Sequence, residues 1–263
     1  FKNLTVDDGL SDNAITCLYE DREGYVWIGS EQGLDRYDGQ TVLPVAGIRE
    51  HVTSVLEGLN GTVWVTTSNA GLLELDTHTM EAVGYRRTAQ DASSIASDQL
   101  TALYDLNDTT LLIGSREVSM IFMDKRTHRF TYWTDSTSID PKLASDRPYE
   151  LGGWCHGFTA LGNGTLWISM LNNYASFVAD LRSGAIVQRV ALPNEKKSAP
   201  AGAQSSMEQK PDKDGQVSYT GLALSPDGST IYLSNVRGSI KVFAVDAAGK
   251  VTSSRTIALP AAN

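Results

Sequence analysis

The chain has few basic residues, little cysteine and no long apolar run. Its 263 residues carry 22 Lys and Arg against 31 Asp and Glu, a formal net charge of −9. A nucleic-acid partner requires a basic surface, so this balance argues against one. No stretch approaches the about 18 consecutive apolar residues of a membrane span, so we expect none. The first residues lack the charged and apolar regions of a signal peptide, so we expect any such peptide to be removed or never present.

Cysteine, histidine and glycine give no sign of a cofactor. Two cysteines, Cys17 and Cys155, are too few for a disulfide scaffold, and we expect both thiols to be free. His51, His78 and His128 have no metal-ligand spacing. The Gly-rich segments lack the strand-to-helix context and the trailing Lys-Ser/Thr of a phosphate loop. The sequence therefore predicts neither a cofactor nor a metal.

A motif built on a Trp-Ile or Trp-Val pair recurs along the chain. The clear copies are YVWIGS at 25–30, TVWVTT at 62–67 and TLWISM at 165–170, with degenerate copies LLIGS at 111–115 and IYLSN at 231–235. The anchor residues are Trp27, Trp64, Leu112, Trp167 and Tyr232, at spacings of 37, 48, 55 and 65 residues. Repeats of this length are typical of solenoids, propellers and arrays.

The segments before the anchors align column by column, with one extra residue in the last copy. The second column is Thr16, Thr53, Thr101, His156 and Thr220. The third column is small in every copy: Cys17, Ser54, Ala102, Gly157 and Gly221. The fourth is apolar: Leu18, Val55, Leu103, Phe158 and Leu222. The small column predicts a first strand close to a crowded propeller axis.

Each copy reads as four short strands separated by turns. The first turns, DREG, GLNG, LNDT, LGNG and SPDG, contain residues that favour tight turns. No segment has a sustained apolar period of 3.6, so we predict almost no helix. The sequence predicts an all-β fold, a β-propeller of about five four-stranded blades in a single domain. The blades are expected at about 7–47, 48–97, 98–150, 151–215 and 216–263, with residues 1–6 closing the last one.

Residues 2–42 resemble the first repeat of the two-component-regulator propeller family. The resemblance lies in the GLSDN entry, the DREGYVWIGS hairpin and the GLDRYDG turn, and it weakens over 51–87 and 100–133. It implies a propeller like those of periplasmic sensor ectodomains of bacterial hybrid histidine kinases, many of which respond to glycans. Such ectodomains usually have many more blades.

The C-terminal stretch resembles a different propeller group. Residues 218–246, with the LALSPDG and YLSN segments, look like a blade of the lactonase-like and surface-layer (YVTN-type) proteins. Two propeller types in one chain arise either by divergence or by joining fragments. An engineered or recombined chimeric scaffold without evolved activity is therefore one alternative reading.

Catalytic constellations are weakly represented. Cys155 and His156 are adjacent on an expected strand, so their side chains point to opposite faces, which is unsuited to a catalytic pair. Acidic pairs around Asp12 and in 20–23 could in principle serve glycoside hydrolysis, but the second cluster is already explained as a hairpin turn. A lactonase-like or glycoside-hydrolase enzyme is a second alternative, and the prediction is a non-catalytic domain.

The expected binding face is the end of the propeller that carries two sets of loops. The loops entering the first strands contribute Asn13, His51, Gln99, Trp154, His156 and Tyr219. The turns from second to third strand contribute Gln32, Asn69, Arg116, Asn172, Tyr174 and Arg237. Amides, aromatic rings and guanidinium groups suit a small polar or glycan ligand. We therefore expect a ligand-recognition domain of the sensor type, periplasmic or extracellular if natural.

Overall fold

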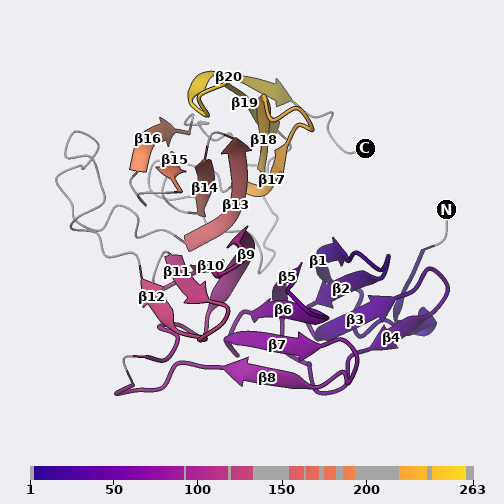
Figure 1. Ribbon diagram of the computed structural model, residues 1–263. Coiled ribbons are helices and arrows are strands. Elements are labelled where there is room, and N and C mark those ends of the chain that lie inside the picture. Colours follow the sequence, from indigo (N-terminus) through magenta and orange to yellow (C-terminus); the bar gives the residue numbers. More distant parts are fainter. Residues whose placement is uncertain are drawn as a thin grey trace, which may run out of the picture. The chain divides into compact units, whose positions relative to one another are not determined.

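The computed structural model describes residues 3–91, 93–117, 120–132, 154–162, 164–171, 175–181, 186–192, 219–235 and 239–258. The chain divides into two compact units, Phe1–Trp133 and Thr134–Asn263 (Figure 1). Each unit is built from four-stranded antiparallel sheets whose strands are hydrogen-bonded in chain order. We call these sheets blades 1 to 5.

The first unit contains three blades. Blade 1 consists of β1 (Ile15–Glu20), β2 (Val26–Ser30), β3 (Gly33–Tyr37) and β4 (Val42–Pro44). Blade 2 consists of β5 (Val52–Glu57), β6 (Thr62–Thr67), β7 (Leu72–Asp76) and β8 (Ala82–Tyr85). Blade 3 consists of β9 (Leu100–Asn107), β10 (Thr110–Ser115), β11 (Met120–Asp124) and β12 (Phe130–Tyr132).

The second unit contains two blades. Blade 4 consists of β13 (Trp154–Gly162), β14 (Thr165–Leu171), β15 (Ala175–Asp180) and β16 (Ile186–Ala191). Blade 5 consists of β17 (Tyr219–Leu224), β18 (Thr230–Asn235), β19 (Ser239–Val245) and β20 (Val251–Ala258). In the described part of the chain the one helical element is a 3-10 turn, η1 (Val6–Asp8).

The predicted fold class is confirmed: the protein is all-β and made of five four-stranded propeller blades. Each sheet lies within one of the expected blade ranges. The single closed domain and the pairing of residues 1–6 with the last blade stay predictions. Within the first unit, Leu4 packs against blade 1, next to Leu10, Ile28 and Val42.

Aspartates set the outer turns of the blades. Asp76 and Asp124 end the third strands of blades 2 and 3, and Asp38 directly follows that of blade 1; each accepts two backbone N–H groups from the following turn. These hydrogen bonds hold the pKa of each carboxyl below its ordinary value. Asp is common in turns because its short carboxylate accepts hydrogen bonds from backbone N–H groups that have no partner strand. The turn chemistry seen in the sequence therefore has a direct structural cause.

The core lies between blades rather than within them. We call the blade face that carries the anchor residue its outgoing face, and the opposite face its incoming face. Trp27 packs in one cluster with Val55 and Val65 of blade 2, and Trp64 with Leu100 and Ile113 of blade 3. In the second unit, Trp167 packs with Ile231, Leu233 and Phe243 of blade 5. The three tryptophans are 0%, 2% and 0% exposed, which confirms their predicted core role.

The second sequence column marks a β-bulge in every blade. The pairing of the first two strands shifts between Ile15 and Cys17, and at the equivalent point in the other four blades. The residues skipped are Thr16, Thr53, Thr101, His156 and Thr220. A bulge turns a side chain away from the regular alternation of the strand.

Two of these threonines connect neighbouring blades. The Thr16 hydroxyl donates to the backbone carbonyl of Val52 at 2.6 Å, from blade 1 to blade 2. The Thr53 hydroxyl donates in the same way to the carbonyl of Leu100 at 3.0 Å, from blade 2 to blade 3. Because Val52 and Leu100 begin β5 and β9, these bonds align the starting ends of the first strands in the first unit.

Candidate ligand-binding face

In the first unit the loops expected to bind are joined in pairs by one recurring backbone hydrogen bond. The amide of the second-to-third turn donates to the carbonyl of the residue just before the first strand. The pairs are Glu31 to Ala14 at 3.1 Å, Ser68 to His51 at 2.9 Å, and Arg116 to Gln99 at 3.0 Å. The entering loop and the second-to-third turn of each blade therefore lie at the same end.

The three loop pairs form a row along that end of the first unit. The first strands lie side by side, held at their starting ends by Thr16 and Thr53. We call this row the loop face. It consists of residues 12–14 and 31–32 of blade 1, 49–51 and 68–70 of blade 2, and 96–99 and 116–117 of blade 3.

Blade 1 contributes differently from the expected pattern. Ala14, not Asn13, occupies the position of His51 and Gln99. The amide oxygen of exposed Asn13 accepts the backbone N–H of Val6 at 3.0 Å, which fixes the N-terminal segment. Asp12 is hydrogen-bonded to the side chain of Gln32 across the loop pair, and the backbone N–H of Ala14 is the main cause that lowers its pKa. An amide and a carboxylate thus represent blade 1 on the loop face.

Blades 2 and 3 contribute the remaining described side chains. His51 and Arg116 are half-buried, whereas Gln99 and Asn69 are exposed. The imidazole, the guanidinium and two amides therefore come from adjacent loops on a fixed backbone. Together they offer hydrogen-bond donors and acceptors at several points on this face.

Charged residues at this end were missed by the sequence analysis. Arg86 and Arg87 follow β8, and the end of a fourth strand lies at the same end as the start of the first. Arg86 faces Glu50 at 3.8 Å, and Arg87 faces Glu117 of blade 3 at 3.8 Å. The Arg-Arg pair directly after the EAVGY strand is the signal that could have revealed them.

Gly71 fixes the contact between the loops of blades 2 and 3. Its φ is +79°, and a Cβ atom there would lie 2.3 Å from the carbonyl oxygen of Tyr85. Its amide donates to the carbonyl of Asp98 at 3.0 Å, and the Asp98 carboxylate accepts the backbone N–H of Arg87 at 2.7 Å. A substituted residue fits neither the backbone angle nor the space, so this contact requires glycine.

For the expected binding residues of the second unit, the structure describes the position in the strand and not the side chain. Trp154 begins β13 opposite Leu171, and Tyr219 begins β17 opposite Asn235. His156 is the bulged residue of β13. The side chains of these three lie outside what the structure describes, as do Asn172, Tyr174 and Arg237 entirely, so their expected role stays a prediction.

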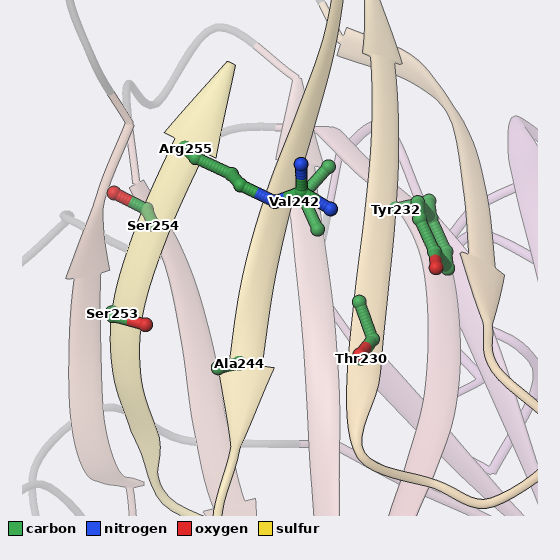
Figure 2. A pocket seen from close by; sticks show the side chains of 7 residues that line it. All are labelled: Thr230, Tyr232, Val242, Ala244, Ser253, Ser254 and Arg255. Carbon is green, nitrogen blue, oxygen red and sulfur yellow. The ribbon is translucent and has the colours of Figure 1, made fainter. Parts of the chain in front are cut away.

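A separate hollow of about 170 Å³ lies on the outgoing face of blade 5. Figure 2 shows its seven lining residues on β18, β19 and β20, with the Arg255 side chain reaching from β20 toward Val242. Ala244 and Ser253 are paired across β19 and β20, and their small side chains leave the space. The hollow is not part of the loop face.

Two kinds of feature are absent from the described residues. They contain no group of three or more His, Cys, Asp and Glu side chains placed to hold a metal ion. Nor is any helix in them both long and apolar enough to cross a membrane. Cys17, which lies in β1, is a free thiol, and burial raises its pKa to about 11. The expectation that Cys155 is also free falls on a side chain outside the described set.

Solved structures of low sequence identity resemble this chain over most of its length. The extracellular domain of the hybrid two component system BT3049 from B. thetaiotaomicron matches 95% of this chain and 31% of its own, with a TM-score of 0.67 and 18% identity. The corresponding domain of BT4673 from the same organism matches 98% and 30%, with a TM-score of 0.65 and 13% identity. The chain therefore spans about a third of the length of these two structures.

A third similar structure comes from a different organism. The Cps50 (Swd1) β-propeller domain of Myceliophteria thermophila matches 90% of this chain and 67% of its own, with a TM-score of 0.61 and 13% identity. At these identities the likeness establishes the fold, and no finding supports a chimeric origin. No curated protein sequence matches the chain. Residues 9–32 match the family model of the two component regulator propeller, so blade 1 carries that family's repeat within an all-β propeller chain.

Proposed function

We propose that the chain is a non-catalytic ligand-recognition propeller of the sensor type, acting outside the cytoplasm, in the periplasm or extracellular space. The observation that carries the proposal is the loop face. Three loop pairs, joined by the same backbone hydrogen bond, present amide, imidazole and guanidinium groups in one row. The family match at 9–32 and the likeness to two extracellular domains of hybrid two component systems support the sensor assignment.

The proposed ligand is a small polar molecule or a glycan. A polyhydroxylated ligand needs many hydrogen bonds, which Gln32, His51 and Gln99 are able to provide from three adjacent blades. Arg116 adds a planar cation suited to carboxylate or sulfate groups on such a ligand. Within the second unit, Trp154, His156 and Tyr219 stand at or near the starts of the first strands of blades 4 and 5, and the proposal assigns them a ligand-binding role of their own.

The test is binding across a panel of glycans and small anions, measured by calorimetry or thermal shift. Arg116→Ala and His51→Ala are expected to weaken binding of any recognised ligand by at least about tenfold, the effect of losing one well-made hydrogen bond to a charged or polar group. Arg126→Ala is the matched control, because Arg126 is an exposed arginine of the same blade in a turn at the opposite end.

Binding that survives both loop-face substitutions unchanged, or that is lost equally in the Arg126→Ala control, would reject the loop face as the binding site. Turnover of any panel compound would reject the non-catalytic assignment. The two results separate the location of the site from its chemistry.

A further inference from the structure

The loop end of blades 2 and 3 gathers positive charge on an otherwise acidic chain. The formal net charge of the chain is −9, and blade 1 brings Asp12 and Glu31 but no basic residue to the loop face. Where blades 2 and 3 meet, this end of the unit carries four arginines and three carboxylates, namely Arg49, Arg86, Arg87 and Arg116 with Glu50, Asp98 and Glu117. The sign of the charge therefore changes along the row of loops.

Two of these arginines are fixed at the backbone and open at the guanidinium. The Asp98 carboxylate accepts the backbone N–H of Arg87 at 2.7 Å, and the Asp98 carbonyl accepts that of Gly71 at 3.0 Å. The side chains of Arg86 and Arg87 are nevertheless 59% exposed. Within the described residues, neither guanidinium group makes a hydrogen bond. Because a guanidinium carries five N–H donors, most of the donor capacity of both residues is available to a ligand.

The ion pairs that these arginines make are weak. Arg86 faces Glu50, and Arg87 faces Glu117, each with 3.8 Å between nitrogen and oxygen, which is longer than a hydrogen bond. Exposed ion pairs of this kind contribute little to stability. The other oxygen of Glu50 accepts the backbone N–H of Arg49 at 2.9 Å, and the Glu117 side chain is 41% exposed to water. Both carboxylates therefore keep a partner when an incoming anion displaces them.

We propose that Arg86 and Arg87 make the loop face selective for ligands that carry a carboxylate or sulfate group, each arginine exchanging its glutamate for oxygens of the ligand. The inference rests on the proposed ligand-binding role of the loop face and adds the chemical class that it selects. A planar guanidinium binds two oxygens of a carboxylate or sulfate at once, which an exposed glutamate at 3.8 Å does not achieve here. A neutral ligand of the same shape has to leave both glutamates in place and gains nothing from either arginine.

The test uses the full chain and small probes of defined charge. Inorganic sulfate and D-glucuronate are the two anionic probes, and D-glucose is a neutral probe similar in size to glucuronate. Calorimetry at constant ionic strength measures binding, and the Nε–Hε NMR signals of Arg86 and Arg87 locate it. At least one anion is expected to shift both signals in a saturable way, and glucose is expected to leave them unchanged. A response to sulfate alone or to glucuronate alone identifies the group that is recognised.

Substitution of the glutamates gives a readout that a merely structural role would not move. Glu50→Gln and Glu117→Gln keep the side-chain shape and remove a competing charge, so each is expected to raise anion affinity up to about fivefold. Arg86→Gln combined with Arg87→Gln is expected to lower it at least about tenfold, because the charged donors are gone. All four positions are in the exposed loops of this end, so the variants should keep the circular dichroism of the unmodified chain.

The controls are Arg126→Gln and Glu81→Gln, which change exposed residues in the outer turns of blades 3 and 2, at the opposite end of the unit. Both should leave anion affinity unchanged. The inference is overturned by an unmodified chain that binds neither anion in a saturable way. It is also overturned by a double arginine variant that binds as tightly as the unmodified chain, or by glutamate variants that both fail to bind more tightly.

Failure of this inference and failure of the proposed function give different results. A neutral glycan that loses affinity in His51→Ala, together with no anion binding at Arg86 and Arg87, overturns the inference and keeps the proposed function. A panel of ligands on which His51→Ala and Arg116→Ala have no effect rejects the proposed function itself, whatever Arg86 and Arg87 bind.

Discussion

Ser11 donates two hydrogen bonds to the buried carboxylate of Asp35, one from its backbone N–H at 2.9 Å and one from its hydroxyl at 2.6 Å. Asp35 is fully buried, and Ser11 lies in the loop that enters β1. The two residues belong to the GLSDN and GLDRYDG segments through which blade 1 resembles the regulator propellers. These two segments, separated in sequence, therefore form one structural unit.

Removing this carboxylate is expected to destabilise the first unit. Asp35→Ala leaves both Ser11 donors without their acceptor in a buried site, so we expect a loss of about 2–3 kcal/mol in the free energy of unfolding. Ser11→Ala removes one bond and keeps the other, and should cost about 1 kcal/mol. Urea unfolding followed by circular dichroism measures both. Equal losses in the two variants would contradict the paired arrangement.

The threonine of a bulge is expected to stabilise the contact with the next blade. Thr53→Val keeps the shape of the side chain but removes the hydroxyl that bonds to Leu100, so we expect a loss of about 1 kcal/mol. Thr16→Val should give a similar loss, through Val52. The same unfolding experiment checks both, with Thr41→Val, in the exposed outer turn between β3 and β4, as the control. No loss in either variant would show that the bulge bonds do not stabilise the contact.

Cys17 is expected to react slowly. Burial raises its pKa from 9.0 to about 11, so at pH 8 the fraction of thiolate is about a hundredfold smaller than in an ordinary cysteine. The folded state keeps the thiol protonated at a pH where the unfolded state has lost the proton. The free energy of unfolding is therefore highest below pH 9 and falls as the pH rises toward 11.

Labelling of native protein with a thiol reagent from pH 7 to 11 tests the rate, with protein in denaturant as the reference. Cys17→Ala should weaken the fall in unfolding free energy above pH 9, because the titrating group is gone. A Cys17 that labels as fast in native as in denatured protein at pH 8 would contradict the raised pKa.

Two tryptophans at the same column position are expected to respond differently to substitution. The Trp27 indole N–H donates to Asp21 at 2.7 Å, six residues before it. Six residues before Trp167 stands Leu161, and the Trp167 indole N–H is buried without an acceptor in the described residues. Trp27→Phe should therefore cost about 1–2 kcal/mol more than Trp167→Phe, because the first loses a hydrogen bond to a carboxylate. Urea unfolding of both variants measures the difference, and a larger loss at Trp167 would refute this explanation.

Much of the loop face could be predicted from the repeat alignment, but its register in blade 1 could not. The repeat alignment, counted back from the anchor residues, predicted that His51 and Gln99 lie beside the second-to-third turns, as they do. Asn13 lies in the entering loop as predicted, but Ala14 takes the position equivalent to His51, and the Asn13 amide oxygen accepts the backbone N–H of Val6. Arg86 and Arg87 were missed because their approach to Glu50 and Glu117 depends on how the loops of neighbouring blades meet.

The sequence by itself determined the blades: their number, their four strands and their turns. These features depend on local physics, namely the period-two alternation of strands and the residues that satisfy backbone groups within tight turns. Only the tertiary structure decided which contacts the residues in each column of the internal repeat make. A threonine reads as an ordinary strand residue until the carbonyl of Val52, 36 residues away, lies within 2.6 Å of its hydroxyl. Partners across blade boundaries are tens of residues apart in the chain, so local sequence patterns do not reveal which atoms meet.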